Sequence, residues 1–248
     1  MKKLFDKDEV WFAVIWIIAY VVLFSVADGL SDAIGIPKLI TVAVGLIMTG
    51  VLYLFARKYK LQEYLGLCTA KGNYKSLLWF LPLAVISSVN LWGGIAVQGS
   101  ATEILLYVVS MCFVGFLEEV IFRGLLFKGM AKTNVTAAVI VSSLTFGMGH
   151  AVNLLMGAPL GETLLQLVYA SAVGFCFTAI FLAGGSIWPC ILAHAFVNGT
   201  SVIACPQSFE LQLITAGVQT AVSIAYGLWL LRVWNKDRKE TADGNSDH

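Results

Sequence analysis

The stretch VWFAVIWIIAYVVLFSVA, Val10 to Ala27, contains no charged residue and is long enough to cross a membrane as a helix. About 20 helical residues span the ~30 Å hydrocarbon core of a bilayer. The rest of the chain has the same character, with 58% hydrophobic and 12% charged residues among 248. An ordinary soluble domain has about 25% charged residues. The sequence therefore predicts an all-α, polytopic membrane protein.

Apolar runs of similar length recur along the chain. The further runs are Leu39–Ala56, Ser76–Thr102, Thr133–Gly161, Thr163–Phe209 and Leu211–Leu231. The run from Thr163 is long enough for two passes, and LAGGSIWP at Leu182–Pro189 supplies a turn between them. The segment Glu103–Lys128 adds one more helix, so we predict a bundle of about eight transmembrane helices.

The loops between the predicted helices alternate in charge. One set carries Lys2, Lys3, Lys7, Arg57, Lys58, Lys60, Lys71, Lys75, Lys128, Lys132, Arg232, Lys236, Arg238 and Lys239. The other set carries Asp28, Asp32, Lys38, Glu103, Glu162 and Glu210. Cytoplasmic loops are enriched in Lys and Arg, so both termini are predicted to be cytoplasmic. We expect one transmembrane domain over residues 1–234, a polar cytoplasmic tail over 235–248, and, in a prokaryote, location in the cell membrane.

Composition also limits the partners and the redox chemistry. The net charge is +1, and the basic residues lie at helix ends rather than in a stripe, so no nucleic-acid partner is expected. The five cysteines are odd in number and lack a C-x-x-C spacing, so they are interpreted as small buried hydrophobes. The lipid bilayer is the one partner that composition alone predicts.

The segment GFLEEVIFRGLLF, Gly115 to Phe127, places three ionisable side chains inside a predicted membrane helix. Such groups are costly in a bilayer and usually face the protein interior. Glu119 and Arg123 have the i, i+4 spacing of an ion pair, whereas Glu118 lies about 100° around the helix without a local partner. A desolvated carboxylate without a cation is suited to proton exchange, which makes Glu118 the stronger candidate for chemistry. The alternative is an ion-pair network that only packs helices.

Two histidines add to this set. FGMGH places Phe146 and His150 on one helix face, with Asn153 a turn further along, and HAFVN places His194 and Asn198 on one face. A single histidine in a membrane helix is more often a packing residue. Two histidines, one of them followed by an amide at i+4, favour a site.

Helical rise along the predicted helices allows Glu118, His150, His194 and Asn198 to meet in one layer, which we expect to be reached from the cytoplasmic side. A carboxylate and a histidine can deprotonate water, and a second histidine with an amide can stabilise an oxyanion. These are the parts needed to hydrolyse an amide bond. Glu118, His150 and His194 are also a zinc-type ligand set, so the expected cofactor is either none or a divalent metal, with the metal-free mechanism preferred.

Three short motifs carry a resemblance to a known family. EEVIFR (Glu118–Arg123), FGMGH (Phe146–His150) and HAFVN (His194–Asn198) resemble, in order, the signatures of the CPBP family, also called Abi or CAAX-protease-like intramembrane proteases, over about residues 105–204.

The resemblance implies an intramembrane endopeptidase, commonly classed as a metalloendopeptidase. It implies that Glu118 and His150 activate water and that His194 and Asn198 form the oxyanion site. Glu119 and Arg123 then form a structural or substrate-positioning pair, with Phe146 supporting them. The implied substrate is a membrane-associated peptide or protein, lipidated or bacteriocin-like in some members.

Two other functions use the same residues. A non-catalytic peptide-binding or bacteriocin-immunity protein would hold a peptide in the cavity without cleaving it. A transporter would relay protons through Glu118 and the histidines, although the sequence shows no inverted repeat.

Overall fold

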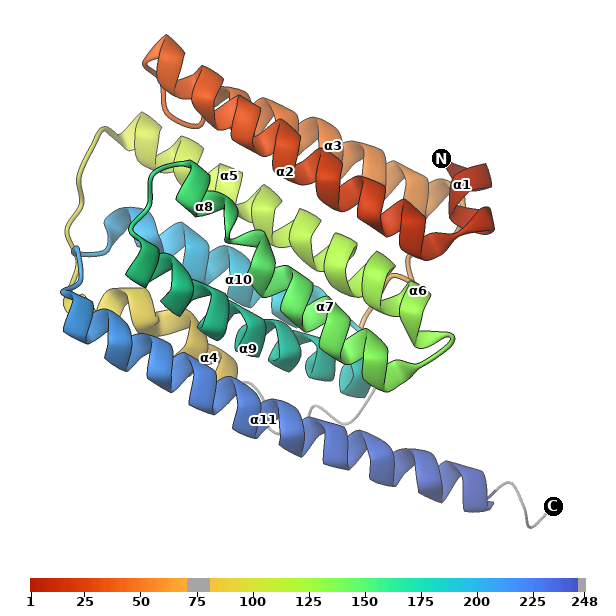
Figure 1. Cartoon of the computed structure of the whole chain (residues 1–248). Helices are drawn as coiled ribbons and strands as arrows, with labels where there is room; N and C mark the ends of the chain where they lie inside the picture. Colours follow the sequence, from red (N-terminus) through yellow and green to blue (C-terminus); the bar gives the residue numbers. More distant parts are fainter. Residues whose placement is uncertain (71–80, 245–248) are drawn as a thin grey trace.

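The computed structural model describes residues 1–70 and 81–244, which form a bundle of helices (Figure 1). The helices are α1 (Lys2–Lys7), α2 (Glu9–Ile34), α3 (Leu39–Lys58), α4 (Leu81–Ser88), η2 (Val89–Gly93), α5 (Ala101–Glu119), η3 (Val120–Phe127), α6 (Lys128–Ala131), α7 (Val135–Gly149), α8 (Val152–Leu155), α9 (Leu160–Gly184), α10 (Trp188–Thr200), η4 (Ser201–Ile203) and α11 (Phe209–Gly244). Within these residues the only β pairing is an isolated bridge between Ile95 and Ala204. The all-α prediction is confirmed.

Six helical stretches in the described residues are long and apolar enough to cross a membrane. They are Glu9–Ile34, Leu39–Lys58, Ala101–Ala131, Val135–Leu155, Leu160–Gly184 and Phe209–Lys236. The other two predicted helices are represented by shorter segments, Leu81–Gly93 and α10 with 13 residues. The beginning of the predicted Ser76–Thr102 helix lies outside the described residues.

The residues that follow the Leu81–Gly93 segment pair with the residues that follow α10. Gly94, with φ 100°, follows η2 and ends this helical segment. Beyond it, the Ala96 amide donates to the Ile203 carbonyl at 2.8 Å, and the Cys205 amide donates to the Gly94 carbonyl at 3.1 Å. Irregular backbone at membrane depth is tolerated only where its polar groups find partners inside the protein. The mutual pairing therefore allows η2 to end at Gly93 and α10 to end before a full membrane length.

Local signals set several other helix ends. Ser100 and Glu103 form a reciprocal capping box at the start of α5. Gly35, with φ 80°, ends α2, and Gly185, with φ 67°, ends α9. Because α10 begins at Trp188 with Pro189 in its first turn, the predicted turn in LAGGSIWP is confirmed.

Helix α9 lies inside the bundle, between α7 and α11, whereas α5 packs against α3 on one side and α10 on the other. In Figure 1, α2 and α3 form one edge of the bundle and α11 the opposite edge. Helix α11 continues to Gly244, well past the predicted end at Leu231, so residues 235–244 extend the last helix.

The two ends of the bundle differ in charge. We define the basic end as the one with α1, the C-terminal ends of α3 and α11, and α6, which includes Lys2, Lys7, Arg57, Lys58 and Lys128. The acidic end is the opposite one, with Asp28, Asp32, Glu103, Glu162 and Glu210. Lys71 and Lys75 lie outside the described residues. The N-terminus and the end of α11 lie at the basic end (Figure 1), while cytoplasmic location of this end stays a prediction.

Candidate active site

The helix that carries GFLEEVIFRGLLF changes its winding at the acidic residues. Helix α5 ends at Glu119, and η3 continues it as a π-helical segment whose eight residues are all buried. Such segments are rare and frequently occur at functional sites. The change of winding places Glu118 and Glu119 in the last turn of α5 and Arg123 within η3.

The predicted pair between Glu119 and Arg123 is confirmed. Nη1 of Arg123 donates to Oε1 of Glu119 at 3.1 Å, and both side chains are fully buried. Nη2 of Arg123 donates to the Gly174 carbonyl at 3.1 Å, and the guanidinium lies 4.2 Å from the centre of the Phe146 ring. The Glu119 charge is therefore neutralised inside the protein, and Arg123 ties η3 to α7 and α9.

His194 connects the two adjacent acids. Its Nδ1 lies 2.9 Å from Oε1 of Glu119, and because an ionised carboxylate only accepts, Nδ1 carries the proton and donates. Its Nε2 lies 3.7 Å from Oε2 of Glu118. Glu119 therefore fixes the orientation of the imidazole and directs Nε2 toward Glu118.

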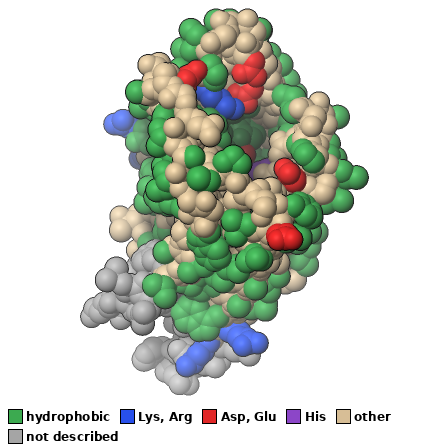
Figure 2. Space-filling model, turned by 90° about the vertical axis from the view of Figure 1, so that its left-hand side faces the viewer, with side chains coloured by type: hydrophobic (Ala, Val, Ile, Leu, Met, Phe, Trp, Pro, Cys, Tyr) green, Lys and Arg blue, Asp and Glu red, His purple; other side chains and the backbone are tan. Residues whose placement is uncertain are grey.

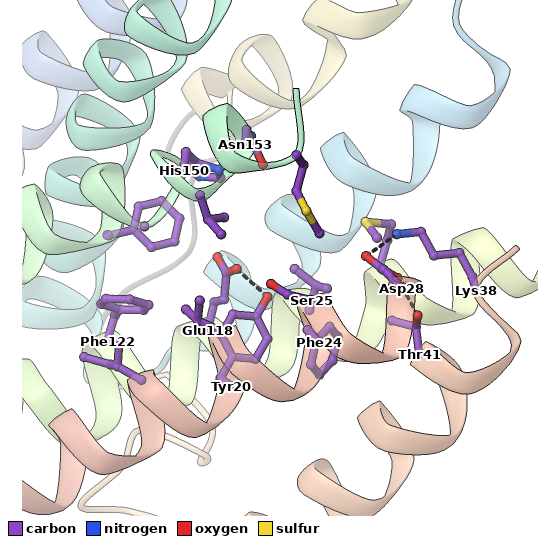
Figure 3. Close-up of a pocket in the computed structure, with 18 residues that line it drawn as sticks. Tyr20, Phe24, Ser25, Asp28, Lys38, Thr41, Glu118, Phe122, His150 and Asn153 are labelled. Atoms are coloured by element: carbon purple, nitrogen blue, oxygen red, sulfur yellow. Dashed lines mark hydrogen bonds and ion pairs between the residues drawn. The ribbon is translucent and has the colours of Figure 1, made fainter. Parts of the chain in front are cut away.

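Glu118 has a partner that helical spacing did not reveal. The hydroxyl of Tyr20, on α2, donates to Oε1 of Glu118 at 2.5 Å, as Figure 3 shows. Tyr20 is buried, and the Glu118 side chain is 12% exposed. One carboxylate oxygen is thus held by the tyrosine while the other faces His194.

His150 stands at the C-terminal end of α7, and a glutamine on α9 holds it. Nε2 of Gln166 lies 3.2 Å from Nδ1 of His150, and Oε1 of Gln166 accepts from Nδ2 of Asn153 at 2.8 Å. Figure 3 shows His150 across the pocket from Glu118. The two side chains share a cavity, and no ion pair joins them within the part of the chain that the structure describes.

Two adjoining cavities collect the predicted residues. The first, of about 210 Å³, is lined by Glu118, Phe146 and His150 among others. The second, of about 90 Å³, is lined by Phe146, His150, His194 and Asn198 among others. Phe146 lies between the two histidines, with ring centres 5.8 Å from His150 and 5.6 Å from His194. All predicted site residues therefore lie together, although Glu118 and Asn198 line different cavities.

Tyr20 and Gln166 are the polar contacts that sequence reasoning missed. Both lie in long apolar runs, outside the motifs that carry the ionisable residues. An amide side chain inside a predicted membrane helix, such as Gln166, indicates a polar contact, because the amide needs a hydrogen-bond partner there. Tyr20 gives no such signal, since tyrosine is frequent in membrane helices near their ends.

The side chains do not form a metal cage in the described residues. A zinc site needs three or four ligands at about 2.0–2.3 Å from one point. No group of three His, Cys, Asp or Glu side chains in residues 1–70 and 81–244 has such an arrangement. Glu118, His150 and His194 do not fit a shared metal in this geometry, and the mechanism below uses only the chain's own groups.

Gly147, three residues before the motif histidine, is predicted to be needed for close helix contact. A Cβ on Gly147 would lie 2.8 Å from the Leu167 carbonyl oxygen and 2.9 Å from the Ser171 nitrogen, both backbone atoms of α9. Gly147→Ala should therefore lower the unfolding free energy by about 1–3 kcal/mol, as overpacking does. Thermal unfolding in lipid nanodiscs measures this loss.

Gly149, two residues further along α7, is the matched control because a Cβ there meets nothing within 4 Å. Gly149→Ala should keep the stability of the wild type. Equal destabilisation by the two alanines would contradict the packing of α7 on α9 that holds His150 beside Gln166.

The first cavity extends from Glu118 to the acidic end of the bundle. Asp28, Lys38 and Thr41 line its outer part, where Nζ of Lys38 donates to Oδ2 of Asp28 at 2.8 Å and the Thr41 hydroxyl donates to Oδ1. Figure 2 looks at this end and shows a hollow with histidine atoms inside it and acidic side chains around it. Glu118 and His150 therefore line a cavity whose mouth is at the acidic end.

The segment that carries these residues also matches a known family. Residues 100–200 match the family described as type II CAAX prenyl endopeptidase Rce1-like. This part of the chain resembles the CPBP family. The CPBP match covers α5 to α10 and includes every candidate residue except Tyr20 on α2.

The chain is also 32% identical over 124 residues to a protein of Bacillus subtilis (strain 168) named "Putative membrane peptidase YdiL". The alignment covers 46% of each protein, so the chain matches about half the length of that relative. No solved structure matches the chain. Helices α2, α3 and α11 lie outside the family match, so their contribution to the site comes from the structure alone.

Proposed function

We propose that this protein is an intramembrane endopeptidase that hydrolyses a peptide bond of a membrane-associated peptide or protein. One observation carries the proposal: Glu118, held by Tyr20, shares a cavity with His150 and lies 3.7 Å from His194 within a membrane-spanning bundle. The family match and the similarity to a protein named as a membrane peptidase support the same reaction class.

The attacking water is placed between Glu118 and His150, which line the first cavity without contacting each other. Glu118 takes a proton from the water, and the imidazole of His150 fixes the water's orientation. General-base assistance of this kind contributes about 10²–10⁴-fold to rate. Tyr20 holds one oxygen of Glu118, so the other oxygen is the one available to the water and to His194.

The second cavity supplies the groups for the oxyanion. His194, protonated on Nδ1 toward Glu119, donates from Nε2 when it is also protonated there, and the Asn198 amide lines the same cavity. Hydrogen bonds aimed at a developing oxyanion are each worth about 3–4 kcal/mol in hydrolases. Glu119 and Arg123 are positioning residues in this account, since they orient His194 rather than touch the substrate.

We propose that the substrate enters from the acidic end, because the first cavity reaches Asp28 and Lys38 there. The excess of Lys and Arg at the other end makes the acidic end the non-cytoplasmic one. Cytoplasmic access, expected from helix depth, stays the alternative prediction. The depth of a residue in the membrane is estimated by counting residues from the predicted turns. This count does not show at which end of the bundle a cavity opens.

Cleavage in a reconstituted bilayer tests the reaction. The purified protein in nanodiscs is incubated with membrane-anchored peptides in heavy-oxygen water, and products are analysed by mass spectrometry. We expect one heavy oxygen in the new carboxyl terminus, and loss of product with His150→Ala. Recovery of intact, bound peptide from the wild type would support the non-catalytic binding function instead.

A further inference from the structure

A third cavity lies on the other side of His150 and opens at the acidic end. It has a volume of about 270 Å³ and lies between η2, α9, the stretch after η4, and α11. Its lining is rich in polar side chains: Asn90, Gln166, Tyr169, Gln207, Gln212 and Gln219. The exposed Glu162 marks its outer part. We name this cavity, together with the second cavity of about 90 Å³ that adjoins it, the amide-lined passage.

The outer and inner parts of the passage are adjacent. Asn90, Gln166, Tyr169 and Gln219 line both the 270 Å³ cavity and the 90 Å³ cavity that holds His150, His194 and Asn198. These four side chains form the boundary between the two cavities. Polar side chains therefore separate the outer cavity at the acidic end from the inner cavity that holds the candidate residues.

Buried amides in a membrane bundle are costly unless their hydrogen-bonding capacity is used. Gln219 is 5% exposed, and its Nε2 donates to the Ile86 carbonyl at 3.2 Å. That bond uses one of the amide's two N–H donors, and the carbonyl oxygen has two acceptor sites. A polar cavity needs about 10–15 Å³ to hold a water, so the 90 Å³ inner cavity has room for several.

The first cavity has a different lining. Ile17, Val21, Phe24, Met111 and Val114 contribute apolar surface to it. The apolar surface of this cavity suits side chains of a membrane-associated peptide, whereas amide side chains suit water. Each turnover of a peptidase consumes one water, whose OH joins the carbonyl carbon and whose other proton passes through the enzyme base to the leaving amine. An active site inside a membrane must therefore be resupplied with water.

We propose that the amide-lined passage delivers the hydrolytic water to the active site from the acidic end, while the first cavity admits the peptide. The inference rests on the proposed function and adds a water-binding site on α9 and α11 to it. Helix α11 lies outside the family match.

The chain's own Cys205 provides the test. Cys205 is half-buried and lines the outer cavity, whereas Cys176 and Cys190 are buried elsewhere and serve as internal controls. The full-length protein in nanodiscs is treated with a charged, membrane-impermeant methanethiosulfonate reagent, and labelled thiols are located by mass spectrometry. We expect labelling at Cys205 and none at Cys176 or Cys190. An unlabelled Cys205 would overturn the passage.

Turnover gives the second readout. The label should block the passage and lower turnover by about tenfold or more, whereas Cys205→Ser should stay active and insensitive to the reagent. Gln219→Leu should lower kcat by about tenfold with KM unchanged, because the peptide cavity is intact.

These experiments distinguish a failure of the water-delivery proposal from a failure of the proposed peptidase function. Cleavage that continues unchanged after Cys205 is labelled, or full kcat in Gln219→Leu, would overturn water delivery and leave the peptidase function standing. Labelling of Cys205 in a protein that cleaves no membrane-anchored peptide would overturn the peptidase function instead.

Discussion

Glu118→Gln should lower kcat by about 10²–10⁴-fold, since the amide keeps the shape of the side chain and removes the base. Tyr20 can still hydrogen-bond the amide oxygen, so the fold should be preserved. The measurement is the initial rate of cleavage of a membrane-anchored peptide, with thermal unfolding as the check on the fold.

Asp32→Asn is the control for this variant, because Asp32 is an exposed acid at the acidic end and does not line the first cavity. It should cleave at the wild-type rate. A Glu118→Gln protein that cleaves normally, alongside an inactive but folded Glu119→Gln protein, would reverse the assignment of the two acids.

Arg123→Met should destabilise the protein by about 3–5 kcal/mol, because it leaves Glu119 buried without its cation. The loss is large since both partners are fully buried and the guanidinium also bonds the Gly174 carbonyl. The measurement is the free energy of unfolding in mixed micelles with increasing denaturing detergent.

The double variant Glu119→Gln with Arg123→Met provides the matched comparison. Because it removes both charges, it should recover a substantial part of the stability that Arg123→Met loses. If the double variant were as unstable as the sum of the two single ones, the interaction between Glu119 and Arg123 would contribute nothing measurable. The buried pair would then not be what holds η3 against α9.

Much of the fold was predictable because membrane helices are specified by long apolar runs. The turn between α9 and α10 followed from the glycines and proline near Gly185. The C-terminal ends of η2 and α10 were not predictable, because apolar composition continues beyond them. These ends depend on backbone pairing between Gly94 and Cys205, far apart in the sequence.

The candidate site was predictable to a similar extent. The spacing of Glu119 and Arg123 correctly predicted their ion pair, since that contact lies within one helix. Helical spacing could not show that His194 bonds Glu119, that Tyr20 bonds Glu118, or that Gln166 contacts His150. Each of these contacts joins two helices and depends on how the bundle packs. The side from which the cavity opens depends on packing in the same way.

The most direct test of the account is a comparison of protein carboxyl termini in membranes from cells that express the wild type or Glu118→Gln at equal levels. Mass spectrometry of carboxyl-terminal peptides identifies every terminus and its parent protein. The account predicts a defined set of new carboxyl termini, from membrane-associated proteins, that appears only with the wild type. Identical sets of termini in the two cell populations would contradict it.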